Sequence, residues 1–136
     1  MTDITDGGGT VLFAHKELAC PETGEVILAP GFADALRDLR KKYGHPMIVM
    51  SCCRTASYNE EIGGHPRSLH VYDQPHHPTG GTAAIDVQRP EGPRLHRLIE
   101  LATAHGWAIG IASEFVHLDR RVDIEADPMM PVIYTY

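Results

Sequence analysis

The chain has 136 residues, of which 43% are hydrophobic and 22% charged, and its formal net charge is −6. These values are typical of one soluble globular domain, and the acidic balance argues against a protein that binds the phosphate backbone of nucleic acids. The N-terminal sequence has no basic start and no long apolar run, so we expect no signal peptide, no transmembrane span, and synthesis in a cytoplasm.

The first part of the chain predicts a flexible start, a helix and a buried strand. Residues 1–12 are polar and glycine-rich, and we expect them to form a flexible segment ahead of one domain at 13–136. Apolar residues at helical spacing predict a helix over 32–43, ended by Gly44. The β-branched run at 46–52 predicts a buried strand.

A long loop dominates the middle of the sequence. One or two helical turns are expected at 55–64, and residues 65–82, dense in proline, glycine, histidine and aspartate, then predict a loop. Loops of this length without structure are uncommon in compact domains unless they carry function. A strand at 83–88 and a helix at 90–106 are expected to follow.

The C-terminal part predicts consecutive strands. Residues 107–112 and 115–122 read as a hairpin, and 131–136 as a last edge strand. Consecutive strands after the helices favour an antiparallel or mixed sheet with helices packed on one side. The predicted fold is therefore a single small α+β domain.

The sequence contains nine histidines, four of them between positions 65 and 77, and imidazole is the commonest metal ligand. A catalytic zinc site needs about three protein ligands and a nearby carboxylate that accepts a proton. His117 is a candidate ligand and Glu114 a candidate base. His70 and Asp86, at the edges of the long loop, are candidates for the other ligands. Arg54 is a cation that could neutralise a substrate carboxylate or an oxyanion.

The candidate residues belong to a series of short motifs in a fixed order: Arg54, Asn59, Gly63-Gly64, Ser68-x-His70, Ala84-x-Asp86 and Glu114-x-x-His117-x-Asp119. In this order and between these elements, the motifs resemble the family of zinc D-Ala-D-Ala carboxypeptidases and L-alanyl-D-glutamate endopeptidases. The family shares its fold with the hedgehog signalling domain and includes bacterial cell-wall peptidases and phage endolysins. The resemblance extends from about Phe13 to Arg120.

The resemblance implies a peptidase that binds one zinc ion per chain through His70, Asp86 and His117, with Glu114 as the general base. On a regular strand, residues three apart point to opposite faces. We therefore expect a bulge or turn between Glu114 and His117, or Glu114 in the loop before a strand that begins at Phe115.

The resemblance also implies a substrate site. Arg54 would hold the carbonyl or carboxylate end of the substrate, and Ser68 would line the site. Asp119 is expected to hold His117 or Arg54 by a hydrogen bond. The implied substrate is a stem peptide of peptidoglycan, cleaved by carboxypeptidase or endopeptidase chemistry.

The sequence departs from the family in the spacing of two expected ligands. Asp86 follows His70 by 16 positions, more than twice the usual spacing. We expect an inserted loop near 71–82 that bulges outward, since each doubling of loop length costs only about 0.6 kcal/mol. The insertion carries His76 and His77, which, like His65, either compete for the metal or remain solvated. The inserted loop could also form a lid or a specificity wall.

Three other functions remain open at this point. The first is a zinc-stabilised domain that binds cell-wall peptide or another protein, against which the carboxylate of Glu114 argues. The second is a phage structural component with an idle motif. The third uses Cys53 and a histidine as nucleophile and base, although the three cysteines are better explained as small buried residues. The lack of a signal peptide favours a phage-type lytic enzyme that acts on the wall after release, of unknown oligomeric state.

Overall fold

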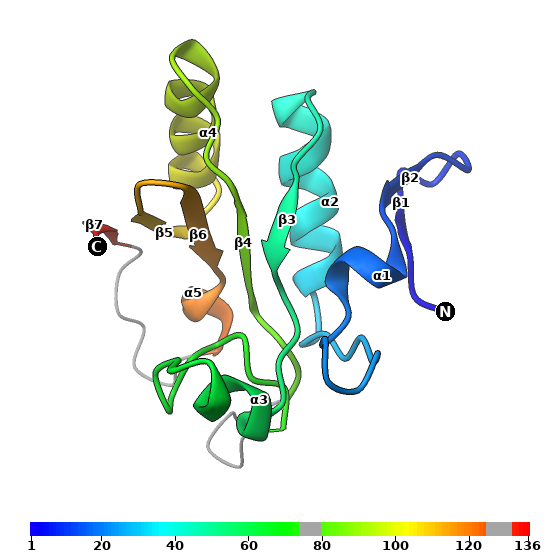
Figure 1. Ribbon diagram of the computed structural model, residues 1–136. Coiled ribbons are helices and arrows are strands. Elements are labelled where there is room, and N and C mark those ends of the chain that lie inside the picture. Colours follow the sequence, from blue (N-terminus) through cyan, green and yellow to red (C-terminus); the bar gives the residue numbers. More distant parts are fainter. Residues whose placement is uncertain (74–79, 125–131) are drawn as a thin grey trace.

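The computed structural model describes residues 1–73, 80–124 and 132–136. A five-stranded sheet forms its centre (Figure 1), and its strands lie in the spatial order β3 (Val49–Ser51), β4 (Ala84–Gln88), β6 (Phe115–Asp119), β5 (Ala108–Ile111) and β7 (Ile133–Thr135). The first four strands pair antiparallel, whereas β7 pairs parallel to β5. The sheet is mixed, and the expected α+β class is confirmed.

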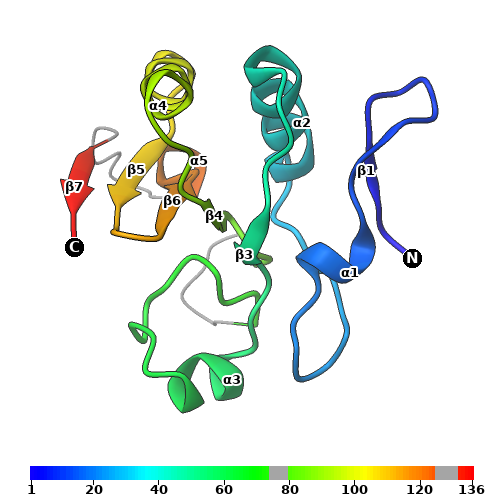
Figure 2. The same ribbon diagram turned by 45° about the horizontal axis from the view of Figure 1, so that its top comes forward.

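Two long helices, α2 (Phe32–Tyr43) and α4 (Pro93–Ala104), pack against each other and lie along the same face of the sheet (Figures 1 and 2). Helix α2 ends as predicted, because Gly44 adopts φ 77° and its N–H donates to the carbonyl oxygen of Arg40. The helices bury their apolar faces against the sheet, where the rings of Phe32 and Trp107 meet edge to face at 5.8 Å. This layer is the hydrophobic core.

The N-terminal segment differs from expectation. Instead of remaining flexible, residues 1–12 contribute β1 (Ile4–Thr5), which pairs antiparallel with β2 (Val11–Phe13). The side chains of Ile4 and Phe13 are buried in the core, and the Asp6 carboxylate accepts the N–H groups that close the turn. The polar, glycine-rich composition is that of the turn, while two apolar residues anchor the hairpin.

Three short helices complete the described chain: α1 (His15–Leu18), α3 (Ala56–Glu61) and α5 (Arg121–Ile124). The strand expected over 115–122 ends at Asp119, because its carboxylate accepts the Arg121 N–H at 3.0 Å and starts the turn of α5. Helices α3 and α5 follow the C-terminal ends of β3 and β6, and therefore lie at the same end of the sheet (Figure 1). Within the described ranges, we find no helix with the length and apolarity needed to cross a bilayer.

Candidate metal centre

One row of residues crosses the sheet on the face away from the two long helices. In register, Ser51 on β3 pairs with Asp86 on β4, Asp86 with His117 on β6, His117 with Gly110 on β5, and Gly110 with Tyr134 on β7. Directly opposed residues of a sheet have β-carbons about 4.5–5.5 Å apart. The pairing of β4 with β6 therefore brings the two predicted ligands Asp86 and His117 into contact.

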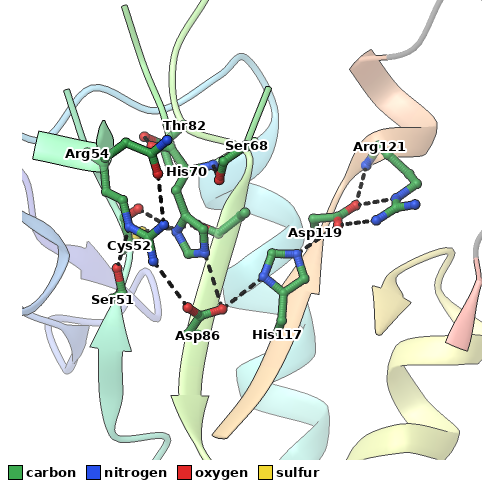
Figure 3. Close-up of polar contacts among 12 residues, drawn as sticks. Ser51, Cys52, Arg54, Ser68, His70, Thr82, Asp86, His117, Asp119 and Arg121 are labelled. Carbon is green, nitrogen blue, oxygen red and sulfur yellow. Dashed lines mark hydrogen bonds and ion pairs between the residues drawn. The ribbon is translucent and has the colours of Figure 1, made fainter. Parts of the chain in front are cut away.

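The third predicted ligand, His70, is held by its backbone and by one ring nitrogen. Its carbonyl oxygen accepts from the Arg54 N–H at 3.0 Å and from the Thr82 hydroxyl at 2.7 Å. Its Nδ1 lies 2.7 Å from the carbonyl oxygen of Cys52. Because a carbonyl can only accept, Nδ1 carries the proton, and Nε2 presents a lone pair to the face that holds Asp86 (Figure 3).

The insertion between His70 and Asp86 does not separate these ligands, because its two ends are joined. The Ala83 N–H donates to the carbonyl oxygen of Leu69 at 2.8 Å, and the Gly81 N–H to that of Tyr72 at 3.1 Å. Gly81 adopts φ 82°, and a β-carbon there would collide with the backbone at Ala29. The backbone pairing fixes the ligand positions independently of the loop length. His76 and His77 lie outside the described residues.

His70, Asp86 and His117 form a buried cluster whose ligand atoms all lie within 4.8 Å of one another. The Oδ1 atom of Asp86 is 3.2 Å from His70 Nε2 and 2.8 Å from His117 Nδ1. His70 Nε2 is buried and has no hydrogen-bond partner within the described residues, so its lone pair faces a carboxylate oxygen without a hydrogen atom between them. Two imidazole nitrogens and one carboxylate are a ligand set that zinc favours, and a cation would satisfy the orphaned nitrogen.

The charges of the cluster shift the pKa values of its members. Burial alone would lower the pKa of His117, but its hydrogen bonds to Asp119 and Asp86 outweigh burial and raise the pKa to about 9. Burial alone would raise the pKa of Asp86, but its contacts with His117 and His70 hold that pKa well below its usual range. Burial lowers the pKa of His70, so its ring is neutral. Without a metal, the His117 ring is therefore protonated on both nitrogens and donates to Asp86 and to Asp119.

Asp119 holds His117 in place. Of the two partners expected for Asp119, His117 and Arg54, it contacts His117. Its Oδ2 lies 2.8 Å from His117 Nε2 and 2.8 Å from Arg121 Nη2 (Figure 3). These contacts outweigh the effect of burial and lower the pKa of Asp119 to about 2. With Nε2–H donated to Asp119, the Nδ1 atom of His117 can bind a metal once it loses its own proton, the arrangement known from carboxylate–histidine–zinc sites.

Arg54 lies over the other side of Asp86. Its guanidinium contacts Asp86 Oδ2 at 3.4 Å, Asn59 Oδ1 at 3.1 Å and Ser51 Oγ at 3.0 Å. A β-carbon at Gly64 would collide with the amide of buried Asn59, so these two motif residues depend on each other sterically. The structure thus explains the glycine as a packing requirement of the residue that holds Arg54.

An open cleft of about 660 Å³ lies over the cluster. Ser68 and Arg54 line this cleft as expected, and the Ser68 hydroxyl accepts the His70 N–H at 3.2 Å. His65 also lines the cleft, but it is exposed, its Nδ1 accepts the Arg67 N–H, and it is not part of the cluster.

The structure does not bring Glu114, the expected general base, to the cluster. Glu114 precedes β6 in the loop, as predicted, but it is exposed and lines a separate hollow with Met50, Gln88 and Arg89. Alternation along β6 explains the separation, because Phe115, His117 and Asp119 point into the cleft.

Comparison with known families agrees with this geometry. A family model described as Peptidase M15 matches residues 11–119. The chain belongs to the peptidase M15 family. M15 peptidases are zinc-dependent, and both the family resemblance and the metallopeptidase class are confirmed. Searches of curated proteins and of solved structures returned no significant match to this M15 chain.

The zinc affinity of this M15 chain is expected to rise with pH up to about 9. Metal binding at Nδ1 must displace the proton that His117 retains below its pKa of about 9. Each pH unit below that value should cost about tenfold in apparent affinity. Titration calorimetry of zinc at pH 7, in buffers of different ionisation enthalpy, should show about one proton released. Release of no proton would show that His117 is neutral in the free chain.

Asp119 and Glu114 offer a matched pair of carboxylates in this M15 site. We expect Asp119→Asn to lower zinc affinity by about 10- to 100-fold, because a neutral amide holds the His117 ring less firmly. Glu114→Gln should leave zinc affinity unchanged, since Glu114 lies in the other hollow. Competition against a chelator of known affinity measures both variants. Equal losses in the two would contradict the geometry.

Proposed function

We propose that this M15 protein hydrolyses amide bonds in the stem peptides of peptidoglycan, as a D-Ala-D-Ala carboxypeptidase or an L-alanyl-D-glutamate endopeptidase with one zinc ion per chain. The observation that carries the proposal is the His70–Asp86–His117 cluster, which lies in an open cleft with one ligand nitrogen unsatisfied. The motifs that resemble this family support the substrate class. Phage origin and action on the wall after release remain part of the proposal.

The side chains of the site have separate tasks in this proposal. His70, Asp86 and His117 hold the zinc ion, which when bound supplies Lewis-acid activation for amide hydrolysis. Arg54, already fixed by Asp86 and Asn59, binds a carbonyl or carboxylate oxygen of the peptide. Asp119 acts through His117 and is a positioning residue.

A second candidate function is a zinc-stabilised domain that binds cell-wall peptide without cleaving it. In the sequence, a Glu114 carboxylate expected beside the metal was an argument against this binding function. Its position in a separate hollow removes that argument. The two functions share the metal site and differ in whether the peptide is cleaved.

Metal content and peptide digestion on the same samples test the proposal. Wild-type protein should contain about one zinc per chain by elemental analysis and cleave muropeptides in a chelator-sensitive reaction. Product masses then identify the bond. His117→Ala should lose both properties, and His96→Ala, an exposed residue of α4, should keep both. Zinc without cleavage would favour the binding domain, and absence of zinc would overturn the metal site.

A further inference from the structure

Aromatic side chains form one wall of the cleft. Phe115 on β6 and Tyr134 and Tyr136 at β7 line it, and we call these three residues the aromatic wall. The ring centroids of Phe115 and Tyr136 are 5.2 Å apart, and those of Tyr134 and Tyr136 5.7 Å. The tilted contacts, at 58° and 56°, hold the rings as one surface beside the metal cluster.

The absence of a side chain at Gly110 places this wall next to His117. A β-carbon at position 110 would lie 2.7 Å from the Tyr134 ring, so the ring occupies the space above the glycine. The Tyr134 ring is thereby 6.3 Å from the His117 ring, and the guanidinium of Arg121 lies 5.8 Å from its centre. Tyr134 is half-buried and fixed between these neighbours.

Tyr136 is the member of the wall that remains available for a ligand. It is 71% exposed, although its ring is held by Phe115 and Tyr134. Two of the arginines that line the cleft are already paired, Arg54 with Asp86 and Arg121 with Asp119, and the third, Arg67, is exposed. A peptide in the cleft therefore meets satisfied charges on the floor and an uncovered apolar surface at the side.

The wall draws its residues from inside and from outside the part of the chain that matches the M15 family. Tyr134 and Tyr136 lie beyond residues 11–119, the part of the chain that the M15 model matches. They reach the cleft because β7 adds to the sheet parallel to β5, next to the row that carries the ligands. These two tyrosines thus add to a cleft whose third wall residue, Phe115, lies within the matched range.

We propose that the aromatic wall is an apolar subsite that packs against the methyl group of the alanine on the carbonyl side of the cleaved bond, with Tyr136 as the specificity-determining residue. The inference rests on the proposed function for its substrate. Aromatic faces give apolar contact area at low entropic cost because only two side-chain angles must be fixed. The wall selects an alanyl residue over a glycyl one by this contact.

Two peptides and three variants test the subsite. The first peptide is the synthetic stem pentapeptide L-Ala-γ-D-Glu-L-Lys-D-Ala-D-Ala, and the second has glycine in place of the alanine on the carbonyl side of the cleaved bond. Tyr136→Ala should raise KM for the first peptide about tenfold with little change in kcat, as expected for loss of ground-state contact. Its preference for alanine over glycine should disappear, and Tyr136→Phe should restore most of it.

Ile133→Ala is the matched control, since Ile133 is an exposed residue of the same strand outside the cleft. It should keep the wild-type KM and preference, and all variants should keep wild-type zinc content. An unchanged KM in Tyr136→Ala, with cleavage intact, overturns the subsite and leaves the proposed function standing. If the wild type binds the first peptide without cleaving it, the proposed function fails, and a Tyr136-dependent dissociation constant still supports the subsite. If it neither binds nor cleaves, both fail.

Discussion

Asp86→Asn is expected to abolish zinc binding and to destabilise the free protein. Asp86 contacts both histidines of the cluster and the Arg54 guanidinium, so one substitution removes the anionic centre of the site. We expect zinc affinity to fall by more than about 100-fold, beyond the 10- to 100-fold loss typical for a residue that only supports a ligand. Without the carboxylate, Arg54 loses the partner of its buried ion pair and His117 keeps only Asp119, which costs about 3 kcal/mol of the free energy of unfolding.

A chelator competition and a urea unfolding curve measure the two effects of Asp86→Asn. Asp38→Asn is the matched control, because Asp38 is an exposed residue of α2 whose ion pair with Lys42 spans 3.8 Å at the surface. Such a pair contributes about 0–1 kcal/mol. Zinc affinity retained in Asp86→Asn would show that the metal is held elsewhere.

The largest loss of stability is expected for Trp107→Ala. Trp107 is buried between the sheet and the helices, where it meets Phe32 at 5.8 Å and lies under the Arg120 guanidinium at 5.1 Å. Truncation of a buried aromatic side chain leaves a cavity and costs about 3–5 kcal/mol, a large share of the about 5–15 kcal/mol that stabilises a domain.

Unfolding of Trp107→Ala should be followed by far-ultraviolet circular dichroism, since the chain has one tryptophan and the variant loses that fluorescence. Ile133→Ala, at an exposed position of β7, should change the free energy of unfolding by no more than about 0.5 kcal/mol. A loss below about 1 kcal/mol in Trp107→Ala would mean that this region of the core repacks around the smaller side chain.

The elements with local signals were predictable from the sequence. Helix α2 shows apolar residues at helical spacing and ends at Gly44, and both signals act within a few residues. The prediction of a flexible segment at 1–12 was wrong, because the buried residues of the hairpin, Ile4 and Phe13, are isolated apolar residues around a polar turn. Strand β1 packs against α2, a contact between distant parts of the chain that no local pattern contains.

The metal cluster was predictable because its residues lie at the edges of recognisable elements. His70 and Asp86 flank a loop, and the structure brings them together with His117 as the resemblance implied. Strand alternation sets Glu114 apart from the cluster. The same period-two spacing places His117 and Asp119 on one face, where Asp119 was expected to hold His117 by a hydrogen bond.

Other residues of the site could not be predicted, because their positions depend on pairings between distant parts of the chain. Thr82 holds the backbone of His70, but its hydroxyl was not distinguishable from any other threonine of the loop. Arg121 was expected within a strand, and it follows Asp119 into a helix turn instead. Tyr134 and Tyr136 enter the cleft through a parallel pairing with β5, and the sequence predicted their strand without its neighbour.

The Tyr134 ring fills the space that a side chain at position 110 would need, so the two positions constrain each other during the evolution of the cleft. A larger residue at 110 would fill the place where the Tyr134 ring lies. The two positions should therefore covary among relatives, since contacting residues constrain each other's size. We expect relatives with a side chain at the position of Gly110 to lack an aromatic residue at the position of Tyr134. Those relatives would have a wider cleft and a different choice of peptide.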